Sequence, residues 1–231
     1  MKNLKKIFGL LAVLAISLTT LVFTSCGSDD DDDKRVEIQY KRNLTTTGTV
    51  TGDEISKIER QFNNEGIKDS WSEKKELTDV QSNINYWRMH ADAAHAELLQ
   101  QNWKGTYTVT VTATYSGSTR TVATYNYAPL GEDSNEKVTI KYKLASTTTS
   151  GTTSELNSII NIFKNKGIKE EFEESCPINR ANHRIEYWKA KAALADYDAQ
   201  QKSWKATYTI TFTAEYNNTN TTIGTYTYKA Q

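Results

Sequence analysis

The chain has 231 residues, enough for one or two domains, and its 28 basic residues balance its 28 acidic residues. A charge this close to zero offers no basic surface for phosphates, so we expect no nucleic acid partner. Hydrophobic residues make up 37% of the chain, enough for a packed core. The two cysteines, Cys26 and Cys176, show no spacing typical of a zinc site.

Residues 1–25 read MKNLKKIFGLLAVLAISLTTLVFTS. Three lysines near the start precede a compact apolar run, and small polar residues follow it. This is the three-part layout of a secretory signal, so we predict a signal peptide over residues 1–25. The apolar run is short for a membrane span, and an uncleaved anchor is the alternative.

A single cysteine and a block of acidic residues follow the signal. The acidic run consists of Asp29, Asp30, Asp31, Asp32 and Asp33. Thr-Ser before Cys26 resembles a bacterial lipoprotein signal, and the acidic run after it resembles the surface-export signal of Bacteroidota lipoproteins. The resemblance covers about the first 34 residues. It implies an acylated (palmitate-bearing) Cys26 that holds the chain in the outer membrane, at the cell surface.

Like charges repel one another, so we expect residues 26–34 to form an acidic, extended tether. Two alternatives remain at this point. The tether is a hydrophilic spacer that faces the periplasm, or Cys26 stays free or enters a disulfide bond.

The rest of the chain contains one unit twice. NNEGIK at 63–68 returns as KNKGIK at 164–169, and NWKGTYTVTVTATY at 102–115 returns as SWKATYTITFTAEY at 203–216. Matches this long indicate a tandem duplication. We therefore expect repeat unit 1 over residues 35–130 and repeat unit 2 over residues 131–231.

Hydrophobic periodicity predicts the elements of each repeat in chain order. VEIQY at 36–40 alternates as a half-buried strand does, and Ile55, Ile58 and Phe62 recur at helical spacing. Gly66 ends this first helix as a left-handed cap, and Gly167 repeats the feature. We give the shared GIK this capping role rather than a binding role.

A longer helix and two strands complete the unit. The helix carries a core-facing stripe of Val80, Ile84, Trp87, Ala91, Ala94 and Leu98. In residues 106–115 apolar side chains alternate with five threonines, and a turn at 116–118 leads to the last strand. We predict an α+β fold: a tandem duplication of a β-α-α-β-β unit, each a two-layer antiparallel sheet covered by two helices on one face.

Three tryptophans are candidate binding aromatics. Trp71 falls in the loop expected between the two helices, where an aromatic residue is a fair candidate for binding. Trp103 and Trp204 stand between the long helix and the next strand. They either plug the end of the core or form an exposed stacking platform for a sugar or a protein.

Other candidates have simpler structural explanations. We interpret HADAAHAE at 90–97 as a solvated helix face rather than a metal site. We interpret the threonine faces of the strands as solvent-exposed sheet surfaces rather than sites for a ligand or a partner sheet. Cys176, expected in a loop, is read as an incidental thiol rather than an intermolecular disulfide or a nucleophile. Glu73 and Glu174 are scattered carboxylates that the sequence alone does not bring together.

The duplication suggests a function, since two linked copies of a module raise avidity. The leading hypothesis is a lipid-anchored, non-catalytic binding module for a glycan or protein partner, without cofactor or metal. The alternative is a structural envelope or assembly subunit that uses sheet-edge pairing. An enzyme ranks third, because no catalytic motif occurs and no histidine is shared by the two copies.

Overall fold

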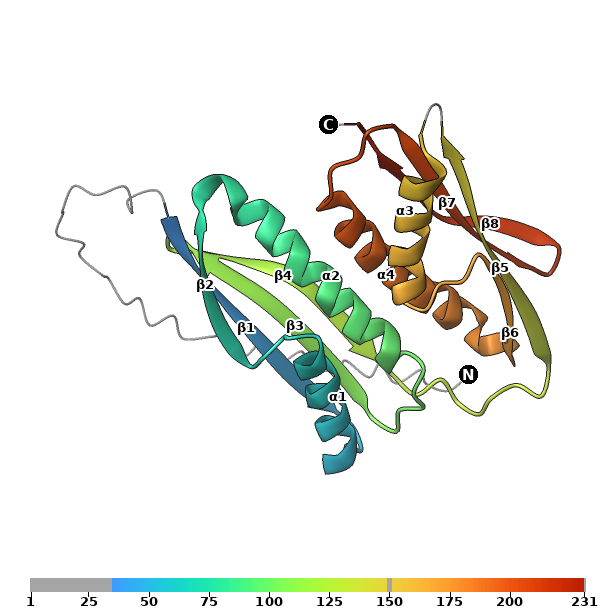
Figure 1. Ribbon diagram of the computed structural model, residues 1–231. Helices are drawn as coiled ribbons and strands as arrows, with labels where there is room; N and C mark the ends of the chain where they lie inside the picture. Colours follow the sequence, from blue (N-terminus) through green and yellow to red (C-terminus); the bar gives the residue numbers. More distant parts are fainter. Residues whose placement is uncertain (1–34, 149–150, 231) are drawn as a thin grey trace, which may run out of the picture. The chain divides into compact units, whose positions relative to one another are not determined.

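The computed structural model describes residues 35–148 and 151–230 (Figure 1). The predicted signal peptide (1–25), Cys26 and the five aspartates lie outside the described residues, so the lipid anchor and the acidic tether stay predictions. Among the described residues, no helix is both long enough and apolar enough to cross a membrane. The described chain forms two repeats with the same element order, joined by residues 128–136.

Each repeat has four strands and two α-helices. Repeat 1 consists of β1 (Arg35–Thr47), α1 (Gly52–Asn64), β2 (Ser70–Glu76), a short 3-10 turn (Leu77–Asp79), α2 (Val80–Leu98), β3 (Thr106–Tyr115) and β4 (Ser118–Tyr127). Repeat 2 consists of β5 (Lys137–Thr148), α3 (Thr153–Asn165), β6 (Glu171–Pro177), a 3-10 turn (Ile178–Arg180), α4 (Ala181–Gln200), β7 (Tyr208–Tyr216) and β8 (Thr219–Tyr228).

Each repeat builds its own four-stranded antiparallel sheet. The strand orders are β2-β1-β3-β4 and β6-β5-β7-β8, and the helices of each repeat cover one face of its sheet (Figure 1). The predicted α+β class is therefore confirmed. The two sheets are separate, a point that the sequence did not decide.

One strand per repeat was missed, so the predicted order β-α-α-β-β is wrong in this detail. Residues 70–76 and 171–177, expected as loops between the helices, are the edge strands β2 and β6. In each strand a glutamate stands in the middle of the inward-facing row, so hydrophobic alternation hardly marks them. Backbone pairing with the long strands β1 and β5 decides their conformation.

The predicted core stripe of the long helix is confirmed. All six stripe residues of α2 belong to one buried cluster with the inner residues of β1 and β3, among them Tyr40, Tyr107 and Val109. The outward positions of β3 are the five threonines, which are partly exposed. One-sided burial of this kind explains the strict alternation in the sequence.

The helix ends also follow the sequence closely. Thr51 caps α1 by accepting a hydrogen bond from the Glu54 amide, and Gly66 ends the helix with φ +80°. Ile67 is fully buried, and its amide donates to the carbonyl of Phe62. Gly66 therefore acts as the cap that its position in GIK predicts.

The two repeats meet through α2 and α4, which run antiparallel. Tyr86 near the start of α2 lies 5.3 Å from Tyr197 near the end of α4, measured between ring centroids. At the other end, the Gln100 side chain donates to the His183 carbonyl at 3.1 Å. A set of small apolar residues is buried outside both repeat cores, and we assign it to this helix pair: Ala93, Ala96, Ala190 and Leu194.

Candidate functional site

The structure places Trp103 and Trp204 in the core. They are only 5% and 6% exposed. Their indole N–H groups donate to the carbonyls of Leu98 and Ala199 at 3.1 and 3.0 Å, which caps the end of the preceding helix. Burial and these bonds favour the core-plug alternative, and an exposed stacking platform is wrong for both residues.

Trp71 lies on the edge strand β2 and takes part in an aromatic group. Its ring stacks on Tyr40 at 4.8 Å and meets Trp87 of α2 edge-on at 5.2 Å. Repeat 2 builds the same group with Phe172 in place of Trp71: Phe172 stacks on Tyr142 at 4.7 Å and meets Trp188 at 4.8 Å. The group is thus a shared feature of the fold.

A carboxylate follows two residues later on the same strand in each repeat. Glu73 is opposite Ile38, and Glu174 is opposite Ile140, so both carboxylates point to the helix-covered face. We name the two equivalent groups by their members. Cluster 1 is Tyr40, Trp71, Glu73, Asn83, Tyr86 and Trp87, and cluster 2 is Tyr142, Phe172, Glu174, Arg184, Tyr187 and Trp188.

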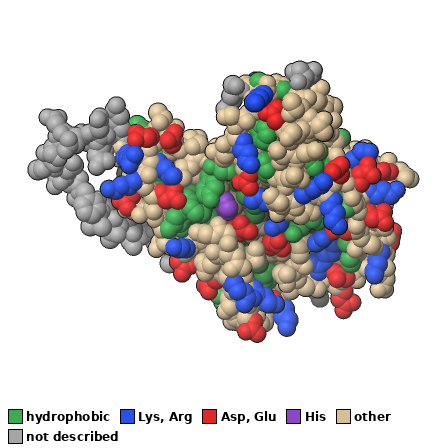
Figure 2. Space-filling view, viewed as in Figure 1, with side chains coloured by type: hydrophobic (Ala, Val, Ile, Leu, Met, Phe, Trp, Pro, Cys, Tyr) green, Lys and Arg blue, Asp and Glu red, His purple; other side chains and the backbone are tan. Residues whose placement is uncertain are grey.

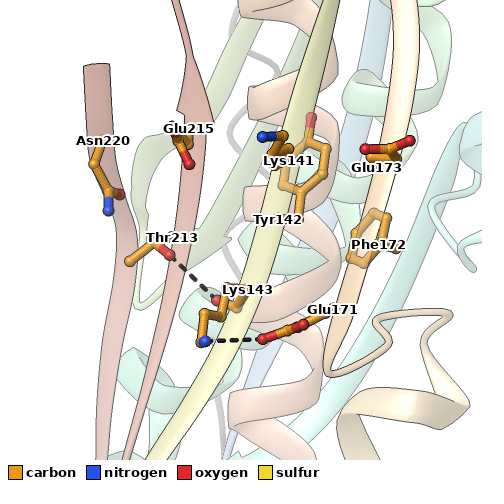
Figure 3. A pocket seen from close by; sticks show the side chains of 9 residues that line it. All are labelled: Lys141, Tyr142, Lys143, Glu171, Phe172, Glu173, Thr213, Glu215 and Asn220. Carbon is orange, nitrogen blue, oxygen red and sulfur yellow. Dashed lines mark hydrogen bonds and ion pairs between the residues drawn. The ribbon is translucent and has the colours of Figure 1, made fainter. Parts of the chain in front are cut away.

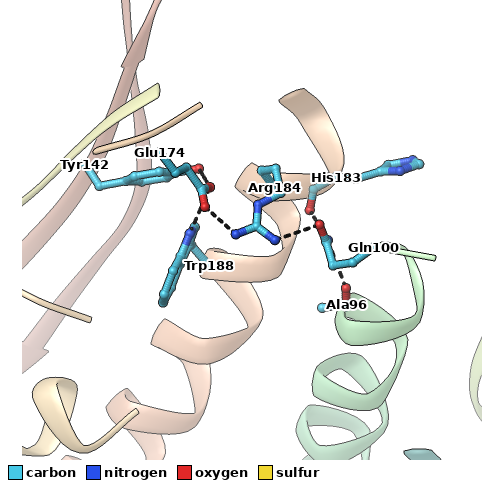
Figure 4. Close-up of polar contacts among 7 residues, drawn as sticks. All are labelled: Ala96, Gln100, Tyr142, Glu174, His183, Arg184 and Trp188. Atoms are coloured by element: carbon cyan, nitrogen blue, oxygen red, sulfur yellow. Dashed lines mark hydrogen bonds and ion pairs between the residues drawn. The ribbon is translucent and has the colours of Figure 1, made fainter. Parts of the chain in front are cut away.

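In cluster 2 the carboxylate is fully engaged (Figure 4). Glu174 accepts hydrogen bonds from the Tyr142 hydroxyl at 2.8 Å and from the Trp188 indole at 3.1 Å. Its other oxygen pairs with the Arg184 guanidinium, which also donates to Gln100 of repeat 1 at 2.9 Å. The bond to Glu174 raises the pKa of Arg184, and burial together with Glu174 raises that of Tyr142.

Cluster 1 lacks the guanidinium because Asn83 stands where repeat 2 has Arg184. The Asn83 side chain accepts from the Tyr40 hydroxyl at 2.7 Å and donates to Glu73 at 2.8 Å. The Trp87 indole is 9% exposed, and its N–H has no hydrogen-bond partner among the described residues. The N–H of Trp71 also has no hydrogen-bond partner among the described residues. Cluster 1 is therefore an incompletely satisfied version of cluster 2.

The helix tyrosines of the two clusters, Tyr86 and Tyr187, also differ in whether a cation lies over the ring. Arg184 and Lys191 both lie over the Tyr187 ring, 5.2 and 5.5 Å from its centroid. Over the equivalent Tyr86, no Arg or Lys cation is found in the described part of the chain. His90 contacts Tyr86 at 4.5 Å between centroids and hydrogen bonds to Glu65.

Three carboxylates act on the Tyr86 hydroxyl, and one of them, Asp198, is paired with Lys166 at 2.8 Å. Burial raises the pKa of the Tyr86 hydroxyl, and Tyr197, Glu73, Asp198 and Glu65 add to the shift. For Tyr187, burial and the nearby Glu97 raise the pKa to about 12. In the space-filling view, hydrophobic side chains reach the surface beside a histidine, with acidic groups close by (Figure 2). The side chains of Trp71, Glu73 and Tyr86 are partly exposed, so a ligand can reach cluster 1 from solvent.

HADAAHAE is not a solvated face, contrary to the expectation. The Tyr125 hydroxyl donates to Asp92 at 2.7 Å, and the His95 ring lies 2.9 Å from the Tyr127 hydroxyl. Burial raises the pKa of Asp92 and lowers that of His95 to about 4. Within residues 35–148 and 151–230, no group of three or more His, Cys, Asp or Glu residues is arranged for a metal ion.

A charged hollow of about 420 Å³ lies on repeat 2 (Figure 3). Lys141 stands between Glu173 and Glu215 in strand register, and the next row pairs Lys143 with Glu171 at 2.8 Å. Repeat 1 has Ser70 and other uncharged residues at most of these positions. The charged side chains are exposed and of both signs, so they can pair with one another across the strands without a ligand.

The remaining candidates are structural. The threonines of β3 bond across the strands, for example Thr114 with Thr119 at 2.8 Å and Thr108 with Asn126 at 2.8 Å. Cys176 lies on β6 rather than in a loop; it is a free thiol, 7% exposed, and burial raises its pKa. A buried thiol with a raised pKa is a poor nucleophile and a poor partner for a disulfide.

Sequence reasoning named Glu73 and Glu174 but missed the clusters around them. The signal was the pair of aromatic-x-Glu strands, Trp71 to Glu73 and Phe172 to Glu174, at equivalent places in the repeats. Repeat 1 has Asn83 where repeat 2 has Arg184. The sequence does not show that this difference concerns the carboxylates, because only the tertiary structure places both residues beside them. Searches of protein families, of curated proteins and of solved structures find no match for this chain.

Proposed function

We propose that this chain is a lipid-anchored protein of the outer membrane that binds a glycan or protein partner without catalysis, and that cluster 1 is the binding site. Acyl chains on Cys26 hold it, and residues 27–34 tether the two repeats outside the cell. The signal, the cysteine and the aspartates of the sequence support this placement.

One observation carries the binding site. The chain builds the same aromatic and carboxylate cluster twice, and it satisfies the polar groups of only one copy. Unpaired polar groups inside a protein are costly and therefore rare, so each one in a fold needs an explanation. Trp and Tyr side chains that are partly exposed are also the residues most enriched at binding hot spots.

The binding site is tested by two matched substitutions. Trp71→Ala and Phe172→Ala remove equivalent rings, each stacked on a tyrosine at the sheet edge. Wild type and both variants are screened on an array of polysaccharides and on a panel of surface proteins. We expect Trp71→Ala to weaken binding at least about tenfold, and Phe172→Ala to have no effect. Equal binding by all three proteins would remove cluster 1 as the site.

The placement is tested separately, by proteinase K treatment of intact cells with a periplasmic protein as control. Digestion of the chain while the control survives supports display at the surface. Protection of both proteins would indicate that the chain lies inside the envelope and that the tether is a spacer facing the periplasm.

The alternative function, assembly through sheet edges, has one observation in its favour. β8 ends its sheet, is ten residues long and contains no charged residue or proline, whereas proteins usually protect such edges. The pairing register shifts between Phe212 and Thr213 of β7, which leaves Ile223 of β8 without a partner position, and a bulge of this kind works against edge pairing. Sedimentation over a range of concentrations distinguishes the two functions, since assembly predicts oligomers.

A further inference from the structure

We infer that cluster 1 binds a guanidinium group, supplied by an arginine side chain of a protein partner, at the position that Arg184 occupies in cluster 2. The inference rests on the proposed function and names the chemistry of the ligand. Because the chain is duplicated, repeat 2 shows how the same cluster looks when an arginine side chain, Arg184, is bound to its carboxylate.

Cluster 2 shows what this scaffold accommodates. Arg184 bonds to Glu174 and lies over the Tyr187 ring, with its central carbon 5.2 Å from the ring centroid. A guanidinium suits both partners at once, because its planar fork matches a carboxylate and its face stacks on an aromatic ring. Cluster 2 is thus an arginine site that the chain fills with its own side chain.

Cluster 1 keeps the carboxylate and the tyrosine that bind the guanidinium in cluster 2, but it has no arginine of its own. Glu73 and Tyr86 stand at the positions of Glu174 and Tyr187. Asn83, in place of Arg184, is neutral and reaches Glu73 at 2.8 Å. The second cation over Tyr187, Lys191, has His90 as its counterpart in repeat 1, and the His90 ring contacts Tyr86 at 4.5 Å between centroids.

The carboxylate of cluster 1 is accessible to a ligand. The Glu73 side chain is 27% exposed, and the one ion pair it makes among the described residues is with Lys75 at 3.6 Å. That lysine is 40% exposed and too far for a hydrogen bond, and exposed pairs of this kind contribute little. A guanidinium that bonds to Glu73 through two N–H groups therefore displaces Lys75 readily.

The unpaired indole points to the same ligand. The Trp188 N–H donates to Glu174, whose position is fixed by Arg184, whereas the Trp87 N–H has no acceptor. If an external guanidinium orders Glu73 as Arg184 orders Glu174, the Trp87 N–H gains the acceptor it lacks. The partly exposed Trp71 beside it gives the rest of the partner an apolar surface.

The test compares two peptides of equal length, one with a single arginine and one with citrulline, the neutral isostere, at that position. Binding to the full chain in detergent is measured by calorimetry and by tryptophan fluorescence. We expect the arginine peptide to bind at least about tenfold more tightly than the citrulline peptide. Glu73→Gln should remove this difference, and the matched control Glu174→Gln should preserve it.

Asn83→Arg is the sharper variant, because it gives repeat 1 the arginine that repeat 2 already holds. It should fold, fill cluster 1 from within and abolish binding of the arginine peptide. A thermal melt checks the folding of every variant.

Equal binding of both peptides, or undiminished binding by Asn83→Arg, would overturn the inference. So would the absence of arginine-peptide binding up to about 10 mM. If neutral glycans or proteins still bind and Trp71→Ala abolishes their binding, the proposed function stands and only the guanidinium is wrong. If Trp71→Ala changes no binding at all, the proposed function fails as well.

Discussion

His95 should make the protein sensitive to mild acid. Its ring stacks on Tyr125 at 4.4 Å and lies 2.9 Å from the Tyr127 hydroxyl, between α2 and β4. Burial, with a smaller effect of His183, lowers its pKa to about 4. The folded protein therefore holds this imidazole neutral at pH values where the unfolded chain would protonate it.

The size of the effect follows from the two pKa values. The unfolded value is about 6.5, so the stabilisation is fully present above that pH and is lost as the pH falls towards 4. Between pH 7.5 and pH 5, this one group should lower the free energy of unfolding by about 2 kcal/mol. Carboxylates whose pKa is lowered in the fold, such as Glu54, add to the loss only in more acidic solution.

Urea denaturation at pH 7.5, 6 and 5 measures the loss. Residues 34–231, which form one compact unit, are compared as wild type, His95→Gln and His90→Gln, which replaces the other histidine of α2. Glutamine can keep a hydrogen bond to Tyr127 but does not titrate. We expect wild type and His90→Gln to lose about 2 kcal/mol more than His95→Gln between pH 7.5 and pH 5. The same pH dependence in all three proteins would refute this account of His95.

Three further predictions concern the fold. Trp103→Phe removes the indole N–H that caps the end of α2 and should cost about 1–3 kcal/mol in urea denaturation; an unchanged midpoint would contradict the capping role. Gly66→Ala should cost more than Gly48→Ala, because both glycines have positive φ but a Cβ at Gly66 would come within 3.2 Å of Trp87 and one at Gly48 would meet nothing. Cys176 should react with a thiol reagent only after denaturant is added, and fast labelling of the native protein would show that β6 opens.

Local pattern was sufficient where one side of an element is buried and the other is wet. The alternation in β3, the stripe on α2 and the cap at Gly66 each depend on residues a few positions apart, so the sequence carries the full signal. The turn at Ser116-Gly117, with positive φ at both residues, is local in the same sense.

Local pattern failed where pairing or a second packing surface decides. β2 was missed because it is a polar edge strand, held by the backbone of β1. HADAAHAE was read as solvated because the helical period marks one core face, whereas β4 covers an adjoining part of α2 and holds Asp92 and His95. The periodicity of a helix shows which residues share a face but not how many faces are covered.

The sequence by itself determined the duplication, the fold class and most of the elements, because these depend on repeated segments and on short-range periodicity. Only the tertiary structure decided that each repeat has its own sheet and that Glu73 and Glu174 lie in equivalent aromatic clusters. It also showed that Arg184 fills one cluster while Asn83 leaves the other incomplete. The physical reason is distance along the chain: strand pairing brings residues 30 or more positions apart together, as it does for Tyr142 and Glu174, and no local period records that contact.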